Sequence, residues 1–400
     1  MTPEIDAFLV KVGVLLHRFG TPAHRLERVM TQWAANQGIQ GVFLYTPTAL
    51  VISLTDDDGE RTYLRRVDSG AVNIDKLIRF DELLEDFEAR RINLVEADAL
   101  LDKVERAPPP YPVWLTILAC AASCGAVAIF FRGTGWEVLA AVALGFFVAL
   151  LGAIQGRMGW ETGFLEPVAG LLASIGALAM AHYTFPMDDR LVTLAALIVM
   201  IPGLKLTVAL TELALGHLSA GAARMAGACV SLLTITVGVG LGWQLAGNWR
   251  NILPVESREN LPEFWQWIAI AAAPLTFSIV FRARWPQWPV IAAVSIAGVV
   301  TNMLLGQITG REVAAFCGAF VVGVGSNLYA RLRDRPALVP LTPGIIVLVP
   351  GSLGYRSLTA FLDHDSVAAV DFAFATVMVA VALVGGVMTA NVLLPPKRIL

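Results

Sequence analysis

Long apolar runs fill the chain from residue 113 onward, and each is about 20 residues long, enough to cross a bilayer as a helix. Residues 1–110 differ, because their apolar positions recur at helical or alternating spacing between charged residues. The pattern predicts an α-helical polytopic membrane protein with a small N-terminal α/β domain. Its ten predicted spans are 113–131, 136–155, 164–183, 190–209, 225–246, 264–281, 287–306, 312–330, 337–356 and 367–394.

Within the N-terminal region, apolar residues between Phe8 and Phe19 have helical spacing, and Gly20 is expected to end that helix. Thr21 is expected to cap a second helix with Pro22 at its first position. The charged residues of this second helix, His24, Arg25 and Glu27, are interpreted as a solvated face. Strands are expected at 42–45, 49–54 and 61–67, with a turn at 56–59, followed by helices at 73–90 and 93–106.

Charge divides the chain in the same way as hydropathy. Of its 61 charged residues, 31 lie in the first 110, before a proline spacer at 108–110. The expected parts are a domain at 1–110, a five-span unit at 111–250 and a second at 262–400. Charged residues near the N-terminus argue against a signal peptide. The loops on the side of the N-terminal domain hold ten Lys and Arg against six on the other side, so both termini are expected in the cytoplasm.

Several classes of function lack support in the sequence. The net charge is −3 and no basic patch suits a nucleic-acid partner. The four cysteines lie in apolar stretches without nearby histidines, so they are interpreted as packing residues rather than metal ligands. No nucleophile elbow, P-loop or HExxH motif occurs. The sequence therefore predicts no cofactor, no metal and no enzymatic activity.

The two five-span units contain three similar segments in the same order. Residues 129–132 read IFFR and 279–282 read IVFR; residues 150–157 read LLGAIQGR and 304–311 read LLGQITGR; residues 198–203 read IVMIPG and 346–351 read IVLVPG. A repeat of five spans places its second copy in the membrane with the opposite orientation. This inverted-topology repeat is typical of secondary transporters.

A Pro-Gly pair interrupts one span of each unit, at Pro202-Gly203 and Pro350-Gly351. Paired interruptions at equivalent positions point to a binding site, because irregular backbone in a membrane is tolerated where protein or trapped water satisfies it. A plain proline kink is the alternative. Pro343-Gly344 favours unwinding in the second unit. The expected substrate-binding residues are these two pairs together with Lys205, Thr207, Thr211, Ser352, Tyr355, Arg356, Asn302 and Asn327. For Lys205 and Arg356 the alternative is that their side chains extend to the lipid headgroups.

Three acidic residues are candidates for coupling transport to protons. Glu166 precedes Pro167 near the start of its span, Glu212 follows the first break, and Asp371 lies early in the last span. Ionisable groups inside a span are costly, which favours a functional role. Glu166 alternatively complements a helix N-terminus, and Glu212 alternatively lies at the membrane surface near His217 and Arg224.

Three motifs give the chain a resemblance to the threonine/serine exporter family in its fused two-half form. They are the N-terminal stretch LLHRFGTPAHRLE at 15–27, PGL at 202–204 with LTEL at 210–213, and LVPGSLGYR at 348–356. The resemblance implies an exporter of L-threonine and L-serine in the cytoplasmic membrane, driven by the proton motive force as an antiporter. His24 and Lys205 depart from the family pattern, and Lys205 leaves the substrate open.

Two alternatives remain beside this interpretation. Relatives built as two separate halves look like exporters of succinate-type dicarboxylates, so that substrate class is the first alternative. A membrane-embedded enzyme or sensor with an active N-terminal domain is the second. The sequence does not decide between a monomer and a homo-oligomer.

Overall fold

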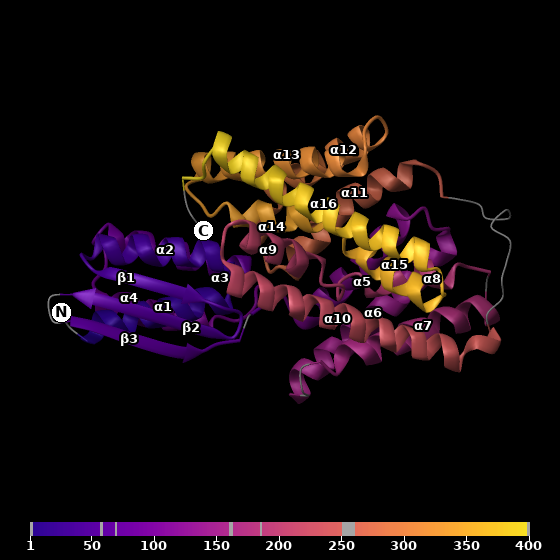
Figure 1. Cartoon of the computed structure of the whole chain (residues 1–400), viewed down its shortest axis with the longest axis horizontal. Coiled ribbons are helices and arrows are strands. Elements are labelled where there is room, and N and C mark those ends of the chain that lie inside the picture. The colour runs from indigo at the N-terminus through magenta and orange to yellow at the C-terminus, as the bar shows by residue number, and fades with distance from the viewer. Residues whose placement is uncertain are drawn as a thin grey trace.

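The computed structural model describes residues 3–56, 59–68, 70–159, 163–184, 186–249 and 261–397. The chain has an N-terminal domain, at the left of Figure 1, and a long body of helices to its right. Several residues used above lie outside the described ranges: Asp57 and Asp58 of the predicted turn, and the loop arginines Arg250, Arg258 and Arg398.

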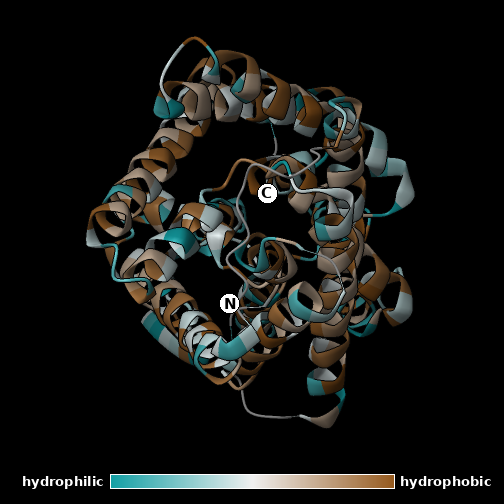
Figure 2. Cartoon of the chain, turned by 90° about the vertical axis from the view of Figure 1, so that its right-hand side faces the viewer, coloured by the Kyte–Doolittle hydropathy of each residue, from teal (hydrophilic) through white to brown (hydrophobic). Residues whose placement is uncertain are grey.

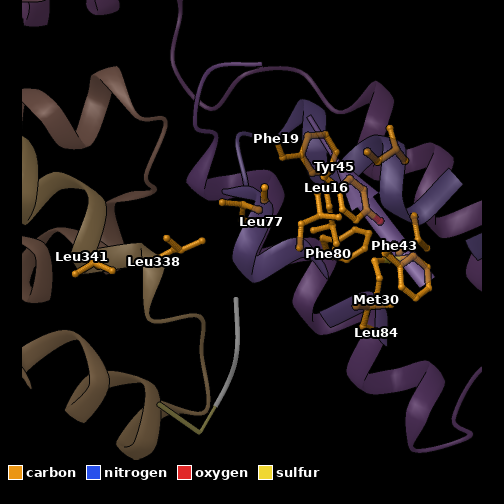
Figure 3. Packing of buried hydrophobic residues seen from close by; sticks show 14 of the residues in the cluster. Leu16, Phe19, Met30, Phe43, Tyr45, Leu77, Phe80, Leu84, Leu338 and Leu341 are labelled. Carbon is orange, nitrogen blue, oxygen red and sulfur yellow. The ribbon is translucent and has the colours of Figure 1, made fainter. Parts of the chain in front are cut away.

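The N-terminal domain combines helices with a small three-stranded sheet, so it contains both kinds of element that the sequence predicts. Its elements are α1 (Pro3–Arg18), α2 (Ala23–Asn36), β1 (Gln40–Tyr45), β2 (Ala49–Asp56), β3 (Gly59–Arg66), α3 (Ile74–Glu88) and α4 (Leu94–Arg106). The strands are antiparallel in the order β1-β2-β3. Figure 3 shows Leu16, Phe19, Tyr45 and Phe80 meeting in the domain's core, with Leu338 of the helical body lying toward it.

One detail of this domain corrects the sequence prediction. Thr21 does not cap α2; the N-cap residue is Pro22, and no side chain of its own segment caps the helix. A proline has no hydroxyl or carboxyl group that could accept the first free N–H groups. The backbone N–H of Ala23 instead donates to Glu212 Oε1, 189 residues away, at 2.9 Å.

The helical body begins at α5 and is apolar along its whole length. Its helices are α5 (Val113–Phe130), α6 (Gly135–Met158), α7 (Leu165–Tyr183), α8 (Asp189–Leu197), α9 (Gly203–Ala214), α10 (Leu218–Leu245), α11 (Phe264–Val280), α12 (Trp288–Gly306), α13 (Arg311–Arg333), α14 (Leu338–Ile346), α15 (Gly351–Leu362) and α16 (Ser366–Leu393). In Figure 2 these helices are coloured brown over most of their length, while teal residues gather at ends and turns.

The number of spans differs from the prediction. Within the described ranges, eight helices are long and apolar enough to cross a membrane, counting α14 and α15 together, and α11 is a shorter apolar helix of 17 residues. The segment predicted as a continuous span at 190–209 is two short helices, α8 and α9. Pro202 ends the regular hydrogen bonding there because it has no N–H to donate.

Both Pro-Gly pairs interrupt helices, as predicted. Pro202 and Pro350 have nearly the same backbone conformation (φ −79°, ψ 41° and φ −79°, ψ 31°), and each precedes a 12-residue helix. Pro343-Gly344 does not unwind the chain, because both residues lie inside α14. The helix continues through them and ends at Ile346 instead.

The two breaks lie against each other. A Cβ atom added to Gly203 would lie 2.4 Å from Val349 Cγ1 and 3.1 Å from Gly351 Cα, and one added to Gly351 would lie 2.9 Å from Ile201 Cγ2. Only glycine lets two backbones approach this closely without displacing a neighbour. The first turns of α9 and α15 therefore cross in contact, and the two half-helices leave this crossing toward different parts of the molecule.

Candidate functional site

A cavity of about 560 Å³ lies where α5, α8 and α15 end or begin. This volume is within the range typical of small-molecule sites. Helix α5 starts beside the N-terminal domain, and Phe131 and Arg132, which line the cavity, follow the C-terminal end of α5. The cavity therefore lies at the end of the body away from that domain. Its other lining residues are Glu137, Asp188, Arg190, Leu191, Leu194, Trp243, Tyr355, Arg356, Thr359, Ala360, Asp363, Asp365, Ala368 and Phe372.

Two sequence-predicted residues, Tyr355 and Arg356, line this cavity from the first two turns of α15. The Arg356 guanidinium lies 4.7 Å from the ring centroid of Phe131, and in the described part of the chain it makes no ion pair. Tyr355 is 2% exposed, and its hydroxyl has no hydrogen-bond partner among the described residues. A buried hydroxyl without a partner destabilises the folded protein, because it has lost its hydrogen bonds to water. A ligand that forms a hydrogen bond with this hydroxyl would recover part of that free energy.

Three other charged residues of the cavity, Glu137, Arg190 and Asp363, are fixed by contacts with its walls. Glu137, 1% exposed, accepts the backbone N–H groups of Thr134 and Asp188, each at 2.7 Å. Arg190 contacts Asp363 through both terminal nitrogens, at 2.7 and 2.8 Å. These contacts tie α6, α8 and α15 together around the cavity and give it fixed walls.

Sequence reasoning missed these wall residues, and only one of them leaves a sequence signal. Thr134 and Glu137 form a capping box, whose spacing of three residues is visible in the sequence. The pairing of Arg190 with Asp363 joins residues 173 positions apart and has no local signal.

The remaining predicted binding residues do not line the cavity. Lys205 is exposed on α9, while Thr207 and Thr211 donate their hydroxyls to the backbone carbonyls of Gly203 and Thr207 within that helix. Ser352 is half-buried on α15, beside the crossing of the two Pro-Gly pairs.

The two asparagines lie in the second half of the body. Asn327 is buried and donates from Nδ2 to Asn391 Oδ1 at 2.8 Å, and Asn302 packs against Gly318 between α12 and α13. Their role in binding stays a prediction.

The three acidic candidates occupy unlike environments. Asp371 is exposed on α16 and Glu166 is half-buried in the first turn of α7. Glu212 is fully buried and accepts two hydrogen bonds of 3.0 Å from Arg224 in a bidentate pair. Glu212 therefore belongs to a fixed contact between α9, α10 and the N-terminal domain.

This contact also corrects the interpretation of His24, Arg25 and Glu27 as a solvated face. Arg25 is 6% exposed, Glu27 Oε2 lies 3.1 Å from His217 Nδ1, and the rings of His24 and His217 are 6.3 Å apart. The polar face of α2 is buried because it docks on the turn between α9 and α10. Docking against a distant segment leaves no trace in local periodicity.

Burial, and after it the charge of Arg25, lowers the pKa of His24 from 6.5 to about 3. His24 Nδ1 is buried and has no hydrogen-bond partner within the described ranges, which fits a neutral ring. Burial lowers the pKa of Arg25 to about 10, so that side chain stays charged. Among the residues placed by the structure, no group of three His, Cys, Asp or Glu side chains could hold a metal ion.

Comparison with protein families gives two matches that together cover most of the chain. Residues 7–246 match the family described as "Putative threonine/serine exporter", and residues 266–393 match the family described as "Threonine/Serine exporter".

Similar curated proteins come from fungi. Pheromone-regulated membrane protein 10 of Eremothecium gossypii is 26% identical over 88% of this chain and 48% of its own length, and its namesake in Saccharomyces cerevisiae is 27% identical over 88% and 46%. An uncharacterized protein of Schizosaccharomyces pombe is 26% identical over 86% and 47%. The chain thus spans about half the length of these relatives. No solved structure matches the chain.

The lowered pKa of His24 predicts that docking of the N-terminal domain weakens in acid. A released His24 with an ordinary pKa of 6.5 takes up a proton as the pH falls below that value, whereas the docked residue does not until about pH 3. Docking is at full strength above pH 6.5 and loses at most about 1.4 kcal/mol per pH unit below it. The charged and titratable groups around His24 are Arg25, Glu27, Arg28, Glu212, His217 and Arg224.

Thermal unfolding in detergent at pH 7.5 and pH 5.0 tests this prediction. The wild type should lose more stability between the two values than His24→Gln, by at least about 2 °C in Tm, because Gln does not titrate. The two proteins differ only at residue 24, so the comparison isolates His24. Equal losses in the two proteins would contradict the prediction.

Proposed function

The chain belongs to the threonine/serine exporter family, and on that premise we propose that it exports L-threonine and L-serine as a proton-driven antiporter. The observation that carries the proposal is Arg356, a half-buried cation that lines the cavity beyond the second Pro-Gly break and makes no ion pair with the residues that the structure describes. An amino-acid carboxylate would pair with it. The buried hydroxyl of Tyr355 and that of Thr359 suit the substrate's own hydroxyl.

The cavity's charges favour a zwitterion over a dicarboxylate. Its walls hold three arginines and four acidic residues. The excess of carboxylates would repel a doubly negative substrate and attract an ammonium group. We therefore favour hydroxy amino acids over the succinate-type alternative. The same cavity argues for transport rather than catalysis, since its residues provide binding groups without a nucleophile–base pair.

The inverted repeat remains part of this proposal and has local support. α8 and α14 each have nine residues, and α9 and α15 each have twelve. Arg132 and Arg282, which follow α5 and α11, share a left-handed backbone (φ 58° and 59°).

The directions of the first helices agree with opposite orientations. Tyr111, just before α5, donates its hydroxyl to the carbonyl of Ala283, just after α11, at 2.7 Å. The start of α5 and the end of α11 thus lie at the same end of the body. We propose the three-part division at 1–110, 111–250 and 262–400 on this basis, with the N-terminal domain and both termini in the cytoplasm, as loop charges favour.

Substitution of Arg356 tests the substrate assignment. Arg356→Gln keeps hydrogen-bonding capacity but removes the charge, so L-threonine affinity should fall at least about tenfold, a loss of about 1.4 kcal/mol. Isothermal titration of the purified protein measures it. Arg311→Gln, which makes the same change at an exposed arginine outside the cavity, is the matched control and should bind as the wild type does.

Unchanged L-threonine affinity in Arg356→Gln would remove the basis of the proposed site. Succinate binding that is stronger than L-threonine binding in the wild type would favour the dicarboxylate alternative instead.

For proton coupling we propose Glu166 rather than Glu212, because Glu212 is fixed by Arg224 and by the N–H of Ala23. Glu166→Gln removes titration while keeping shape. It should abolish accumulation driven by a pH gradient in proteoliposomes and leave exchange at equal concentrations largely intact. If Glu166→Gln still accumulates substrate, the coupling group lies elsewhere, and Asp371 is the next residue to replace.

A further inference from the structure

We propose that the N-terminal domain is the gate on its own side of the transport path: it clamps the two halves of the body together there and must release for the path to open. The inference rests on the proposed transport function. Its basis is a set of contacts that the domain makes with both halves, here called the clamp. The clamp pairs Ala23 with Glu212, Glu27 with His217, Ile74 with Phe281, Asp75 with Arg284, and Glu82 with Arg335.

On the first half, the clamp holds the end of α9. Ala23 and Glu27 at the start of α2 bind Glu212 and His217, and Arg224 completes the contact from α10. The Glu212 carboxylate is fully buried, so removing the Arg224 side chain would leave an uncompensated buried charge. The domain thereby fixes the far end of the 12-residue helix that begins at the Pro202-Gly203 break.

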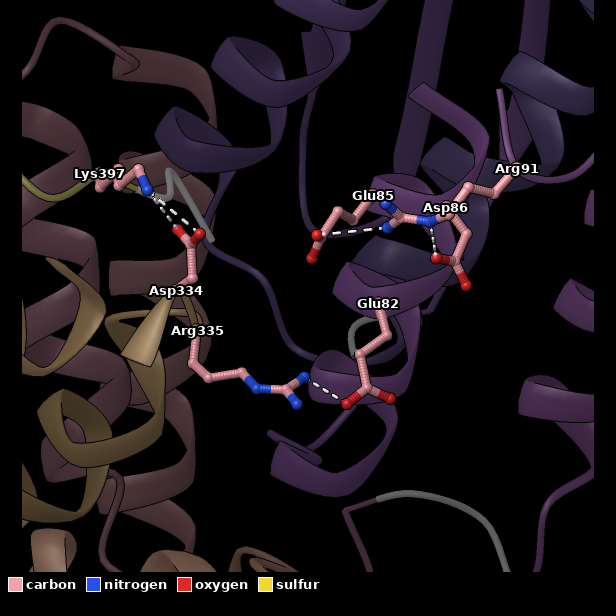
Figure 4. A network of polar contacts seen from close by, with 7 residues as sticks. All are labelled: Glu82, Glu85, Asp86, Arg91, Asp334, Arg335 and Lys397. Atoms are coloured by element: carbon pink, nitrogen blue, oxygen red, sulfur yellow. Dashed lines mark hydrogen bonds and ion pairs between the residues drawn. The ribbon is translucent and has the colours of Figure 1, made fainter. Parts of the chain in front are cut away.

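On the second half, the clamp holds the turns before α12 and α14. The N–H of Ile74 donates to the carbonyl of Phe281 at 3.0 Å, and Asp75, whose side chain is 4% exposed, pairs with Arg284 at 2.6 Å. Figure 4 shows Arg335 reaching across the junction to Glu82 on α3, next to the separate pair of Asp334 and Lys397.

A rigid domain bound to both halves at one end restrains their relative motion at that end. The cavity lies at the opposite end, beyond the crossing of the breaks. The structure therefore corresponds to a state that is closed on the side of the domain. Alternating access requires the halves to separate on each side in turn, and separation on this side stretches the clamp.

A reversible cross-link tests whether the clamp must open. Glu27→Cys combined with His217→Cys places two thiols where carboxylate and imidazole now meet at 3.1 Å, in the contact with the first half. Glu82→Cys with Arg335→Cys in the same protein places two more in the contact with the second half. A short bis-methanethiosulfonate can join each pair. We expect joining to slow L-threonine exchange in proteoliposomes by about tenfold or more, because the open state loses its population. Reduction with dithiothreitol should restore exchange.

The matched control joins two residues inside the domain. Asn36 Nδ2 and Glu88 Oε1 are 3.4 Å apart, so Asn36→Cys with Glu88→Cys should cross-link equally well without reaching the body. Wild type treated with the reagent accounts for the native cysteines. Peptide mass spectrometry measures the yield of each cross-link.

Amide hydrogen exchange in α9 provides a readout that needs no substrate. The cross-link from 27 to 217 should slow exchange in residues 203–214, and the link within the domain should not. If no variant moves L-threonine while α9 still responds in this way, the proposed substrate fails and the clamp stands.

Three results would overturn the clamp. One is transport that stays unchanged in fully cross-linked protein. Another is exchange in α9 that matches the control pair. The third is failure of the 27–217 pair to cross-link under conditions in which the 36–88 pair does, because the contact itself would then be absent.

Discussion

The close crossing of the two Pro-Gly breaks is the constraint from which the other features of the body follow. A membrane helix that stops in the apolar region must have its freed backbone groups satisfied by protein or trapped water. Here each break lies against the other, and Gly203 and Gly351 allow a separation that no side chain would permit. Because α9 and α15 both start at this crossing, their lengths and directions determine which of their residues lie near each end of the body.

The two half-helices lead from this crossing to opposite functional regions. α9 carries Glu212 to the contact with the N-terminal domain, and α15 carries Tyr355 and Arg356 to the cavity. A movement at the crossing would therefore reach both regions through helices of only about three turns. Such an arrangement suits a carrier, in which substrate binding at one end and closure at the other must alternate.

Much of the fold could be predicted from the sequence, because apolar length, periodicity and Pro-Gly punctuation are local signals. They located the long helices of the body, the three strands and both breaks, although 190–209 was expected as one span and is two short helices. Contacts between distant segments had no such signal: Glu212 caps α2 in place of Thr21, and α2 buries the face that holds Arg25. At Pro343-Gly344 the local signal was misleading: the pair was expected to unwind the helix, but α14 continues through it, buried inside the body. Of the candidate site, Tyr355 and Arg356 line the cavity, but its walls depend on Arg190 and Asp363.

Counterflow in proteoliposomes is the most direct test of the central claim that the protein is an alternating-access carrier for hydroxy amino acids. Vesicles loaded with unlabelled L-threonine are diluted into a trace of labelled L-threonine, without any proton gradient. A carrier predicts transient accumulation of label above its equilibrium level, since each site that returns inward carries outside substrate. A simple rise to equilibrium, or no uptake of L-threonine or L-serine at all, would contradict the account.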